Sequence, residues 1–413
     1  MRVAFFVGAF PMASETFVVN AAKAVTGAGH ALAIHALDPS IRGDAPIPPE
    51  VEAAGLTGLV VPSNPPLTPA ARPRAIARAL RALPRHGPRA ARLLAPPPPG
   101  EARDAARALF DAEAVTPGTR YDVLHCHFAT LAPRVQRLRA AGVLSGRLLV
   151  HCRGNDVAAE LPRRPGVARR LFASADGVVA NSEHFRQAAI RLGAREADST
   201  VIPSGLDLSG FPYRDAPPPD GPLRLLTVGR LVEKKGIAYL LDALATLENA
   251  TLDVLGDGPL RGDLEARTQR LGLAERVRFR GAVTHAEVGK AMRGADVFVA
   301  CSVTAASGDQ DAGTNTLKEA MATGLPVVAT RHGGIPELVR DGTEGVLVPE
   351  RDPPALAAAI RALAYDPGRW PVMGAAGRAR VEAGFSQAAS AAKLLAAYEA
   401  LASGTPLSSL DRK

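Results

Sequence analysis

The sequence predicts an α/β protein with two doubly wound domains, each a mostly parallel sheet covered by helices. Two consecutive series of short apolar runs, alternating with helical patterns, indicate this fold. The apolar runs lack strict alternation, as is typical of strands buried on both faces. A proline-rich stretch at residues 215–222 has no apolar period and separates the two series, so we interpret it as a linker.

Each series repeats the strand–helix alternation that a parallel sheet requires. In the first domain, residues 1–210, we expect strands at 3–7, 31–37, 123–126, 148–152, 178–180 and 200–202, and helices at 16–28, 134–141, 167–173 and 184–192. In the second, residues 211–385, we expect strands at 223–228, 251–255, 277–280, 297–300, 327–329 and 345–348, and helices at 237–247, 260–271, 286–292, 317–323 and 355–363. A last helix at 386–402 is expected to pack back onto the first domain. Because ligands of such sheets bind at the carboxyl ends of the strands, the site is expected in a cleft between the domains.

The composition excludes several classes of protein. The 413 residues are 47% hydrophobic and 22% charged, which excludes a disordered chain. No run of about 18 apolar residues is present, so no membrane-spanning helix is expected. Three widely spaced cysteines, Cys126, Cys152 and Cys301, argue against a disulfide framework and for a reducing compartment. The apolar start is interrupted at Pro11 and Glu15, so we expect a buried strand and a cytoplasmic location rather than a signal peptide.

All of the excess positive charge lies in the first domain. Residues 1–210 hold 25 Lys and Arg against 17 Asp and Glu, whereas the rest of the chain holds 24 of each. A Pro- and Arg-rich insert at about 46–118 concentrates this charge, although abundant Arg and Ala codons of a GC-rich genome also explain part of it. Pro84 and Pro88 interrupt its helical stripe of arginines. A solvated helix pair is the favoured interpretation and a peripheral membrane contact the alternative, while nucleic acid is not expected as a partner because no groove-reading motif is present.

The segment 228–237, Val-Gly-Arg-Leu-Val-Glu-Lys-Lys-Gly-Ile, ends a predicted strand and opens a predicted helix. Gly229 allows a sharp turn, after which Arg230 and Lys235 project beyond the carboxyl end of the strand. An anion there would meet two cations and the free N–H groups of a helix start. The segment therefore favours a phosphate site, with an ordinary polar turn as the alternative.

A second polar segment, 302–322, carries two carboxylates eight residues apart. Asp311 lies in a glycine-containing loop, and Glu319 lies just inside the helix that follows. Carboxylates accept hydrogen bonds from vicinal hydroxyls and a helix start receives phosphate, so the segment suits a sugar diphosphate. The alternative is that Asp311 caps a turn and Glu319 is an exposed helix residue.

Further motifs follow one another along nearly the whole chain. They are Phe-Pro-Met-Ala-Ser-Glu-Thr-Phe at 10–17, His-Cys-His-Phe at 125–128, Arg-Gly-Asn-Asp at 153–156, Gly-Asp-Gly-Pro-Leu at 256–260, and Gly-Leu-Pro-Val-Val-Ala-Thr at 324–330 followed by Gly-Gly-Ile-Pro-Glu-Leu-Val at 333–339. In this order they resemble the retaining nucleotide-sugar glycosyltransferases of family four, which have the GT-B fold of two Rossmann-like domains. The nearest pattern is that of bacterial exopolysaccharide transferases of the colanic acid type.

The resemblance implies a donor site in the second domain. Arg230 and Lys235 would hold the diphosphate of a UDP or GDP sugar, and Glu319 would bind the ribose hydroxyls. The base would lie against 281–283, and the remaining donor contacts would come from Gly229, Ala282, Asp311, Ala312, Gly313, Thr314, Asn315 and Thr316. This sequence has Asp311 where the family usually has Glu, so the donor sugar is expected to be unusual.

The resemblance also implies an acceptor site in the first domain. His127 would lie near the transferred sugar, with a core histidine as the alternative. Arg153 would pair with an anionic group of the acceptor or, alternatively, with Asp156. The other acceptor contacts would come from Ser14, Glu15, Thr16, Asn155 and Asp156.

The implied reaction retains the configuration at the anomeric carbon and needs neither a metal ion nor a cofactor besides the donor. Arg230, Lys235, His127 and Asp311 are the expected catalytic residues, and their task is to stabilise the charge that grows on the departing diphosphate. The main hypothesis for the acceptor is a small molecule of specialised-metabolite, antibiotic-type biosynthesis. The alternative is a lipid-linked or exopolysaccharide intermediate, and more remote alternatives are a nucleotide-sugar epimerase and a non-catalytic binding protein.

Overall fold

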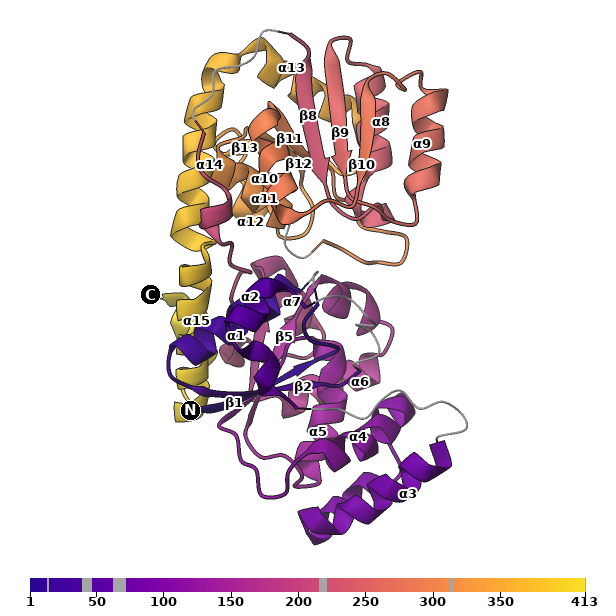
Figure 1. The fold of residues 1–413 in the computed structure, drawn as a ribbon, viewed down its shortest axis with the longest axis vertical. Coiled ribbons are helices and arrows are strands. Elements are labelled where there is room, and N and C mark those ends of the chain that lie inside the picture. The colour runs from indigo at the N-terminus through magenta and orange to yellow at the C-terminus, as the bar shows by residue number, and fades with distance from the viewer. Residues whose placement is uncertain (13–14, 39–46, 62–71, 215–220, 312–314, 413) are drawn as a thin grey trace. The chain divides into compact units, whose positions relative to one another are not determined.

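The structure is a computed structural model that describes residues 1–12, 15–38, 47–61, 72–214, 221–311 and 315–412. The chain divides into two compact units. Unit 1 comprises Met1–Asn181, Phe185–Ile202 and Ala391–Lys413, and unit 2 comprises Ser182–His184 and Pro203–Ser390. Figure 1 shows a parallel sheet with helices packed against it in each unit. The predicted class, two Rossmann-like α/β domains, is confirmed.

Unit 1 contains a seven-stranded parallel sheet in the order β3-β2-β1-β4-β5-β6-β7. Its strands are β1 (Arg2–Val7), β2 (Ala31–Ala36), β3 (Val60–Val61), β4 (Val123–Cys126), β5 (Arg147–Cys152), β6 (Gly177–Ala180) and β7 (Ser199–Val201). The central strands are buried along almost their whole length, as the continuous apolar runs predict. The helices are α1 (Thr16–Gly27), α2 (Pro49–Ala53), α3 (Arg72–Ala82), α4 (Ala102–Ala114), α5 (Ala132–Ala140), α6 (Pro165–Ser174) and α7 (Glu183–Arg191).

The prolines shape the insert as the sequence predicts. Helix α3 ends at Ala82, and two short 3-10 segments follow, Leu83–His86 and Pro88–Leu94. Pro84 and Pro88 each lie at the start of one segment, because proline fits the first turn of a helix but not its interior. Helix α4, which sequence analysis did not predict, then packs against α3 and α5.

Unit 2 contains a six-stranded parallel sheet in the order β10-β9-β8-β11-β12-β13. Its strands are β8 (Leu223–Val228), β9 (Ala250–Leu255), β10 (Val277–Gly281), β11 (Val297–Ala300), β12 (Val327–Thr330) and β13 (Gly345–Val348). The helices are α8 (Ile237–Ala245), α9 (Arg261–Arg270), α10 (His285–Gly294), α11 (Asn315–Thr323), α12 (Ile335–Leu338), α13 (Pro353–Tyr365) and α14 (Trp370–Gly384). Leu225 packs with α8 and α13, and its neighbour Leu226 packs with α10 and α11, so both faces of the sheet are covered by apolar clusters.

The last helix, α15 (Gln387–Ser403), begins in unit 2 and continues in unit 1. Its Leu394, Tyr398 and Leu401 are buried in the cluster that includes Val3, Phe5 and Val7 of β1. Across the described residues, no helix combines the length and the apolar character that crossing a membrane requires.

Candidate active site

Close backbone packing forms the loops at the carboxyl ends of β8 and β9. A Cβ on Gly256 would lie 2.0 Å from the carbonyl oxygen of Gly229, and a Cβ on Gly236 would lie 1.9 Å from that of Cys301. Only glycine fits at these contacts, and both residues have positive φ, 128° at Gly256 and 62° at Gly236. The motifs around 229–236 and 256–260 therefore hold the strand ends together.

Lys235 and Asp311, both predicted donor residues, form an ion pair in unit 2. Lys235 Nζ lies 2.5 Å from Asp311 Oδ2, and the Ser302 hydroxyl donates to the same oxygen at 3.1 Å. Burial raises the pKa of Asp311, but the charge and hydrogen bond of Lys235 outweigh burial and hold that pKa below its usual value. Asp311 is therefore ionised at neutral pH and can accept hydrogen bonds, but it cannot act as an acid.

His332 and Glu350, which sequence analysis missed, fix the loop that carries Asp311. The backbone N–H of Asp311 donates to His332 Nε2 at 2.9 Å, so the proton of a neutral ring must lie on Nδ1. Nδ1 lies 2.6 Å from Glu350 Oε1, and Glu350 Oε2 accepts the N–H of Thr304 at 2.8 Å. His332 is fully buried, so this loop is tied to the end of β12 by a buried chain of hydrogen bonds.

The two cations expected to hold the diphosphate differ in this structure. Lys235 is paired with Asp311, whereas the side chain of Arg230 is exposed and forms no hydrogen bond or ion pair with the rest of the described chain. The neighbouring Lys234 pairs with Asp309 at 2.9 Å. Arg230 is thus available to an incoming anion without breaking an existing bond.

Glu319 lies in α11 and is buried, with 6% of its surface exposed. Its carboxylate has no hydrogen-bond partner within the described ranges. Burial, offset in part by Lys318, raises its pKa from 4.5 to about 7. The alternative interpretation of Glu319 as an exposed helix residue is wrong.

The start of α11 carries further predicted donor residues. Asn315 begins the helix, and its Oδ1 is buried without a partner among the described residues, while Thr316 is half-buried. Ala282 is exposed after β10. Ala312, Gly313 and Thr314 lie outside the described residues.

In unit 1, three histidines share one face of the sheet. His125 and His127 are two residues apart at the end of β4, and His151 lies on the neighbouring strand β5. The rings stack with centroids 4.0 Å apart for His125 and His127 and 5.6 Å apart for His125 and His151. Burial lowers the pKa of His125 to about 3 and lowers those of His127 and His151 well below 6.5, so all three are neutral at pH 7.

The three histidines are partnered unequally. His125 Nδ1 is hydrogen-bonded to the Tyr398 hydroxyl at 2.7 Å. Both ring nitrogens of His127 and of His151 have no partner in the described parts of the chain. In the sequence, the spacing of His125 and His127 along one predicted strand indicates that they share a face. No sequence pattern indicates that Tyr398 joins them.

The histidine cluster is a poor fit for a metal ion, although its ligand atoms lie within 4.8 Å of one another. Lone pairs of imidazole lie in the ring plane, and a zinc ion would have to lie about 2.0–2.1 Å from each nitrogen. The rings of His125 and His127 are stacked and tilted by only 25°, so their lone pairs do not converge. The positive charge of Arg153 also acts on all three rings and opposes a cation.

Arg153 connects several predicted acceptor residues. Its Nε donates to the carbonyl oxygen of His127 at 3.1 Å, and its guanidinium lies 3.5 Å from the ring centroid of Phe17. Burial lowers the pKa of Arg153 to about 9, partly offset by Asp156 and Glu15, so it remains charged at pH 7. Burial raises the pKa of Glu15 to about 6, with Arg153 opposing the shift.

The remaining acceptor residues are placed as follows. Asp156 Oδ2 accepts the backbone N–H groups of Ala129 at 2.9 Å and Arg153 at 3.2 Å. Thr16 and Asn155 are exposed. Ser14 lies outside the described residues. The structure thus brings His127, Arg153, Asp156 and the charge of Glu15 together, whereas Thr16 and Asn155 show no such contact with the residues that the structure describes.

Family models match most of the chain, and relatives match it over much of its length. The family described as "Glycosyltransferase Family 4" matches residues 14–209, and the family described as "Glycosyl transferases group 1" matches residues 222–366. WcaL of Salmonella typhimurium, named for colanic acid biosynthesis as a glycosyltransferase, is 30% identical over 87% of this chain and 90% of its own. The amylovoran biosynthesis glycosyltransferase AmsK of Erwinia amylovora is 31% identical over 64% of this chain and 67% of its own.

Solved structures share the fold. Anabaena Alr3699/HepE, crystallised with UDP and glucose, superposes with a TM-score of 0.70 over 97% of this chain and 100% of that chain, at 19% identity. Sucrose-phosphate synthase of Thermosynechococcus elongatus superposes with a TM-score of 0.71 over 98% of this chain and 100% of that chain, at 23% identity.

Proposed function

The chain belongs to the family 4 glycosyltransferases, and from this premise we propose that it transfers a sugar from a nucleoside diphosphate to an intermediate of exopolysaccharide synthesis. The main hypothesis from the sequence is a small acceptor of specialised metabolism. The relatives named for colanic acid and amylovoran biosynthesis support the polysaccharide alternative better. A lipid-linked form of that acceptor, met at a membrane surface, belongs to the same proposal.

Glu319 is the observation that carries the donor assignment. Burial of the Glu319 side chain disfavours its charged form, and hydrogen bonds from a ligand would offset that cost. Two vicinal hydroxyls of a ribose would donate to its two oxygens and would lower the raised pKa of about 7. The unpartnered Oδ1 of Asn315, one turn earlier on α11, offers a further acceptor.

We assign the diphosphate to Arg230 and Lys235. Arg230 is exposed and unengaged by other described residues, so it can bind phosphate at once. Lys235 is held by Asp311, and a phosphate would share it with that carboxylate. Asp311, kept ionised by this pair, would accept hydroxyl protons of the transferred sugar. Charge that develops on the departing diphosphate would then meet two cations, Lys235 held by Asp311 and Arg230 free to move onto the phosphate.

The proposed reaction retains the anomeric configuration. Asp311, the carboxylate that we assign to the transferred sugar, is engaged by Lys235 and Ser302, so it is not free to act as a nucleophile. Same-face attack by the acceptor, hydrogen-bonded to the departing phosphate, fits these constraints. No metal ion is part of the proposal, since two protein cations neutralise the leaving group.

Nucleotide binding tests the donor assignment directly. UDP, GDP, dTDP and ADP are titrated against the full chain and followed by thermal shift and calorimetry, and we expect UDP or GDP to stabilise it. Glu319→Gln should weaken the preferred nucleotide about tenfold to a hundredfold, as loss of a charged hydrogen-bond acceptor does. Binding of none of the four nucleotides, or unchanged affinity in the variant, would contradict the proposal.

A further inference from the structure

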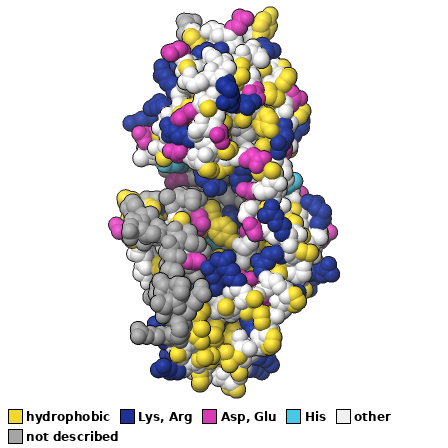
Figure 2. Space-filling view, turned by 90° about the vertical axis from the view of Figure 1, so that its right-hand side faces the viewer, with side chains coloured by type: hydrophobic (Ala, Val, Ile, Leu, Met, Phe, Trp, Pro, Cys, Tyr) yellow, Lys and Arg dark blue, Asp and Glu magenta, His cyan; other side chains and the backbone are white. Residues whose placement is uncertain are grey.

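The insert of unit 1 exposes large aliphatic side chains. Six large hydrophobic residues are exposed in the described chain, and three of them lie here: Ile76 at 43%, Leu80 at 41% and Leu94 at 55%. Ile76 and Leu80 are four residues apart on α3 and so share a face of the helix. Figure 2 shows hydrophobic side chains gathered at the end of the molecule where Figure 1 places α3, with Lys and Arg side chains at the margins.

Unpaired arginines accompany these aliphatic residues. Residues 72–100 contain seven arginines and no Asp or Glu. Arg81, Arg85 and Arg89 are exposed, and none of them forms a hydrogen bond or ion pair with another described residue. Together with Ile76, Leu80 and Leu94 they make up what we call the insert surface.

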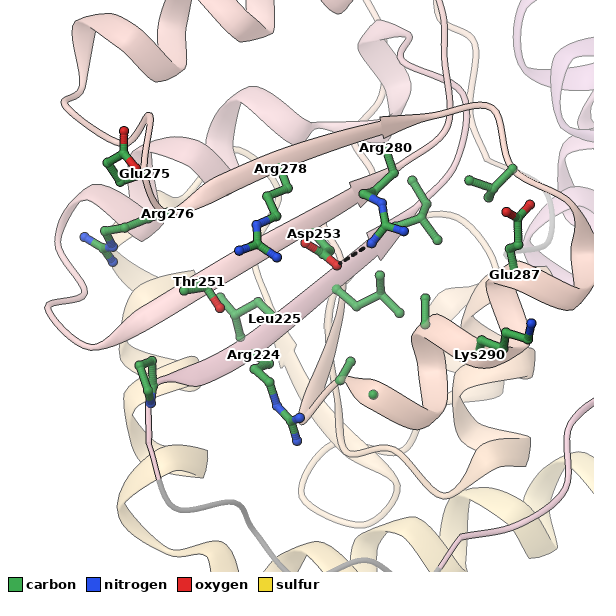
Figure 3. Close-up of a pocket in the computed structure, with 17 residues that line it drawn as sticks. Arg224, Leu225, Thr251, Asp253, Glu275, Arg276, Arg278, Arg280, Glu287 and Lys290 are labelled. Atoms are coloured by element: carbon green, nitrogen blue, oxygen red, sulfur yellow. Dashed lines mark hydrogen bonds and ion pairs between the residues drawn. The ribbon is translucent and has the colours of Figure 1, made fainter.

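A basic groove in unit 2 provides a comparison, because several of its arginines have partners within the unit. It has a volume of about 720 Å³ and is lined by the sheet face of β8 to β10 and by α10 (Figure 3). Arg224 is bound to Asp296, Arg276 donates to backbone carbonyls, and Arg280 pairs with Asp253 at 3.4 Å. Two of its arginines are thus paired with carboxylates of the unit, and Glu275 and Glu287 also line the groove, so it presents less unpaired positive charge than its arginines suggest.

Charge and shape decide which partner fits the insert surface. A second copy of the chain would place arginines opposite arginines, because residues 72–100 offer no carboxylate. Aliphatic side chains with cationic neighbours and no aromatic platform are typical of a surface that rests on the headgroups of an anionic bilayer. Arginine binds phosphate with its planar fork, and a few aliphatic side chains can enter the boundary of the acyl chains.

We propose that the insert surface docks on an anionic phospholipid bilayer, with Arg81, Arg85 and Arg89 on lipid phosphates and Ile76, Leu80 and Leu94 in the headgroup boundary. The docking surface contains none of the residues assigned to the donor or the acceptor. It rests on the proposed function only in that a lipid-linked acceptor would be met at the same bilayer. Binding is expected to be reversible and sensitive to salt, because it depends on a few exposed charges.

Vesicle flotation tests the docking directly. The full chain is mixed with vesicles of phosphatidylcholine and phosphatidylglycerol in equal parts, or of phosphatidylcholine alone, without donor or acceptor. One variant combines Arg81→Gln, Arg85→Gln and Arg89→Gln, and a second combines Ile76→Ser, Leu80→Ser and Leu94→Ser. The first should bind the anionic vesicles on the order of a hundredfold more weakly, at about fivefold per arginine, and the second should also lose binding markedly.

A matched control comes from unit 2. Tyr365 and Val372 are exposed by 91% and 75%, more than any of the three aliphatic residues of the insert surface, so Tyr365→Ser with Val372→Ser removes exposed hydrophobic side chains away from the insert. This variant should float like the wild-type chain. Thermal unfolding and UDP or GDP binding of every variant should match the wild type, which separates a failure of docking from a failure of the proposed transferase function.

The outcomes are distinct. Salt-sensitive flotation that is lost in both insert variants and kept in the control supports the proposal. Absence of flotation, equal binding to neutral vesicles, or undiminished binding by the insert variants overturns it. Self-association that disappears in the insert variants, without vesicle binding, would also overturn it and would assign the surface to a second copy of the chain.

Discussion

One loop of unit 2 and one sheet face of unit 1 differ in how their buried polar groups are partnered. In unit 2, Lys235, Asp311, His332 and Glu350 form a continuous chain of ion pairs and hydrogen bonds around one loop. In unit 1, the ring nitrogens of His127 and His151 are buried without partners among the described residues. The loop of the proposed donor site is therefore fixed by the chain itself, whereas the proposed acceptor face keeps neutral rings that can donate to or accept from a hydroxyl.

Removing a free cation from unit 2 should have the largest effect. Arg230→Ala is expected to lower turnover about 10²–10³-fold, because one charge that stabilises the departing diphosphate is lost. Unfolding should be unchanged, since the side chain is exposed and unpaired within the described chain. Steady-state kinetics and circular dichroism measure the two quantities.

Lys234→Ala is the matched control, because it removes a neighbouring lysine whose partner is Asp309 rather than Asp311. It should lower turnover far less than Arg230→Ala or Lys235→Ala. Near-normal turnover of Arg230→Ala would remove the basis for the diphosphate assignment.

Glu319→Gln tests the difference between the partnered carboxylates of the Asp311 loop and Glu319, which takes no part in that chain of ion pairs and hydrogen bonds. Its pKa is raised from 4.5 to about 7, so the folded state binds the proton more tightly and stability falls as pH rises through that window. At pH 8, the free energy of unfolding of the variant should therefore be about 3 kcal/mol higher than that of the wild type. Near pH 4, the two proteins should be equally stable. Urea unfolding at the two pH values measures this difference, and a variant less stable at pH 8 would contradict it.

Tyr398→Phe tests His125, whose hydrogen-bond partner Tyr398 lies on α15. Loss of the hydroxyl leaves His125 Nδ1 buried without its bond of 2.7 Å and should cost about 1–3 kcal/mol. Tyr121→Phe is the control, because its hydroxyl bonds His35 Nε2 at 3.1 Å and is only partly buried. Equal destabilisation by both changes would mean that the histidine cluster has no special dependence on Tyr398.

The smallest effect should appear on mild acidification. Burial lowers the pKa of His35 to about 4 and that of His125 to about 3. Between about pH 6.5 and 5.5, the unfolded chain therefore binds protons at these two residues, whereas the folded chain does not. Stability should fall by about 1 kcal/mol for each of them between pH 6.5 and 5.5, opposite in sign to the contribution of Glu319. His35→Asn should reduce this slope in chemical denaturation, and an unchanged slope would argue against the neutral buried state.

Local sequence patterns predicted the fold class and the place of the polar segments of unit 2 at the ends of strands. Arg230, Lys235, Asp311 and Glu319 follow predicted strands or open a predicted helix, so their common end of the sheet could be inferred from topology. The end of α3 at Ala82 likewise follows from Pro84 and Pro88, which interrupt the helical stripe of arginines.

Contacts between distant segments could not be predicted. Tyr398 and His125 are 273 residues apart, and the Asp311 to His332 bond depends on a loop path that no periodicity encodes. Predicting the cluster of three histidines would require the register of β4 against β5, which cannot be read from the sequence. The site roles of the named residues remain predictions.

Helix α15 gives unit 1 a discontinuous chain. Residues 1–202 lack Leu394, Tyr398, Leu401 and Leu407, all of them buried in the core around β1. During synthesis, this core can close only after the whole of unit 2 has left the ribosome. An N-terminal fragment made for separate study would therefore need its closing helix supplied as an added segment.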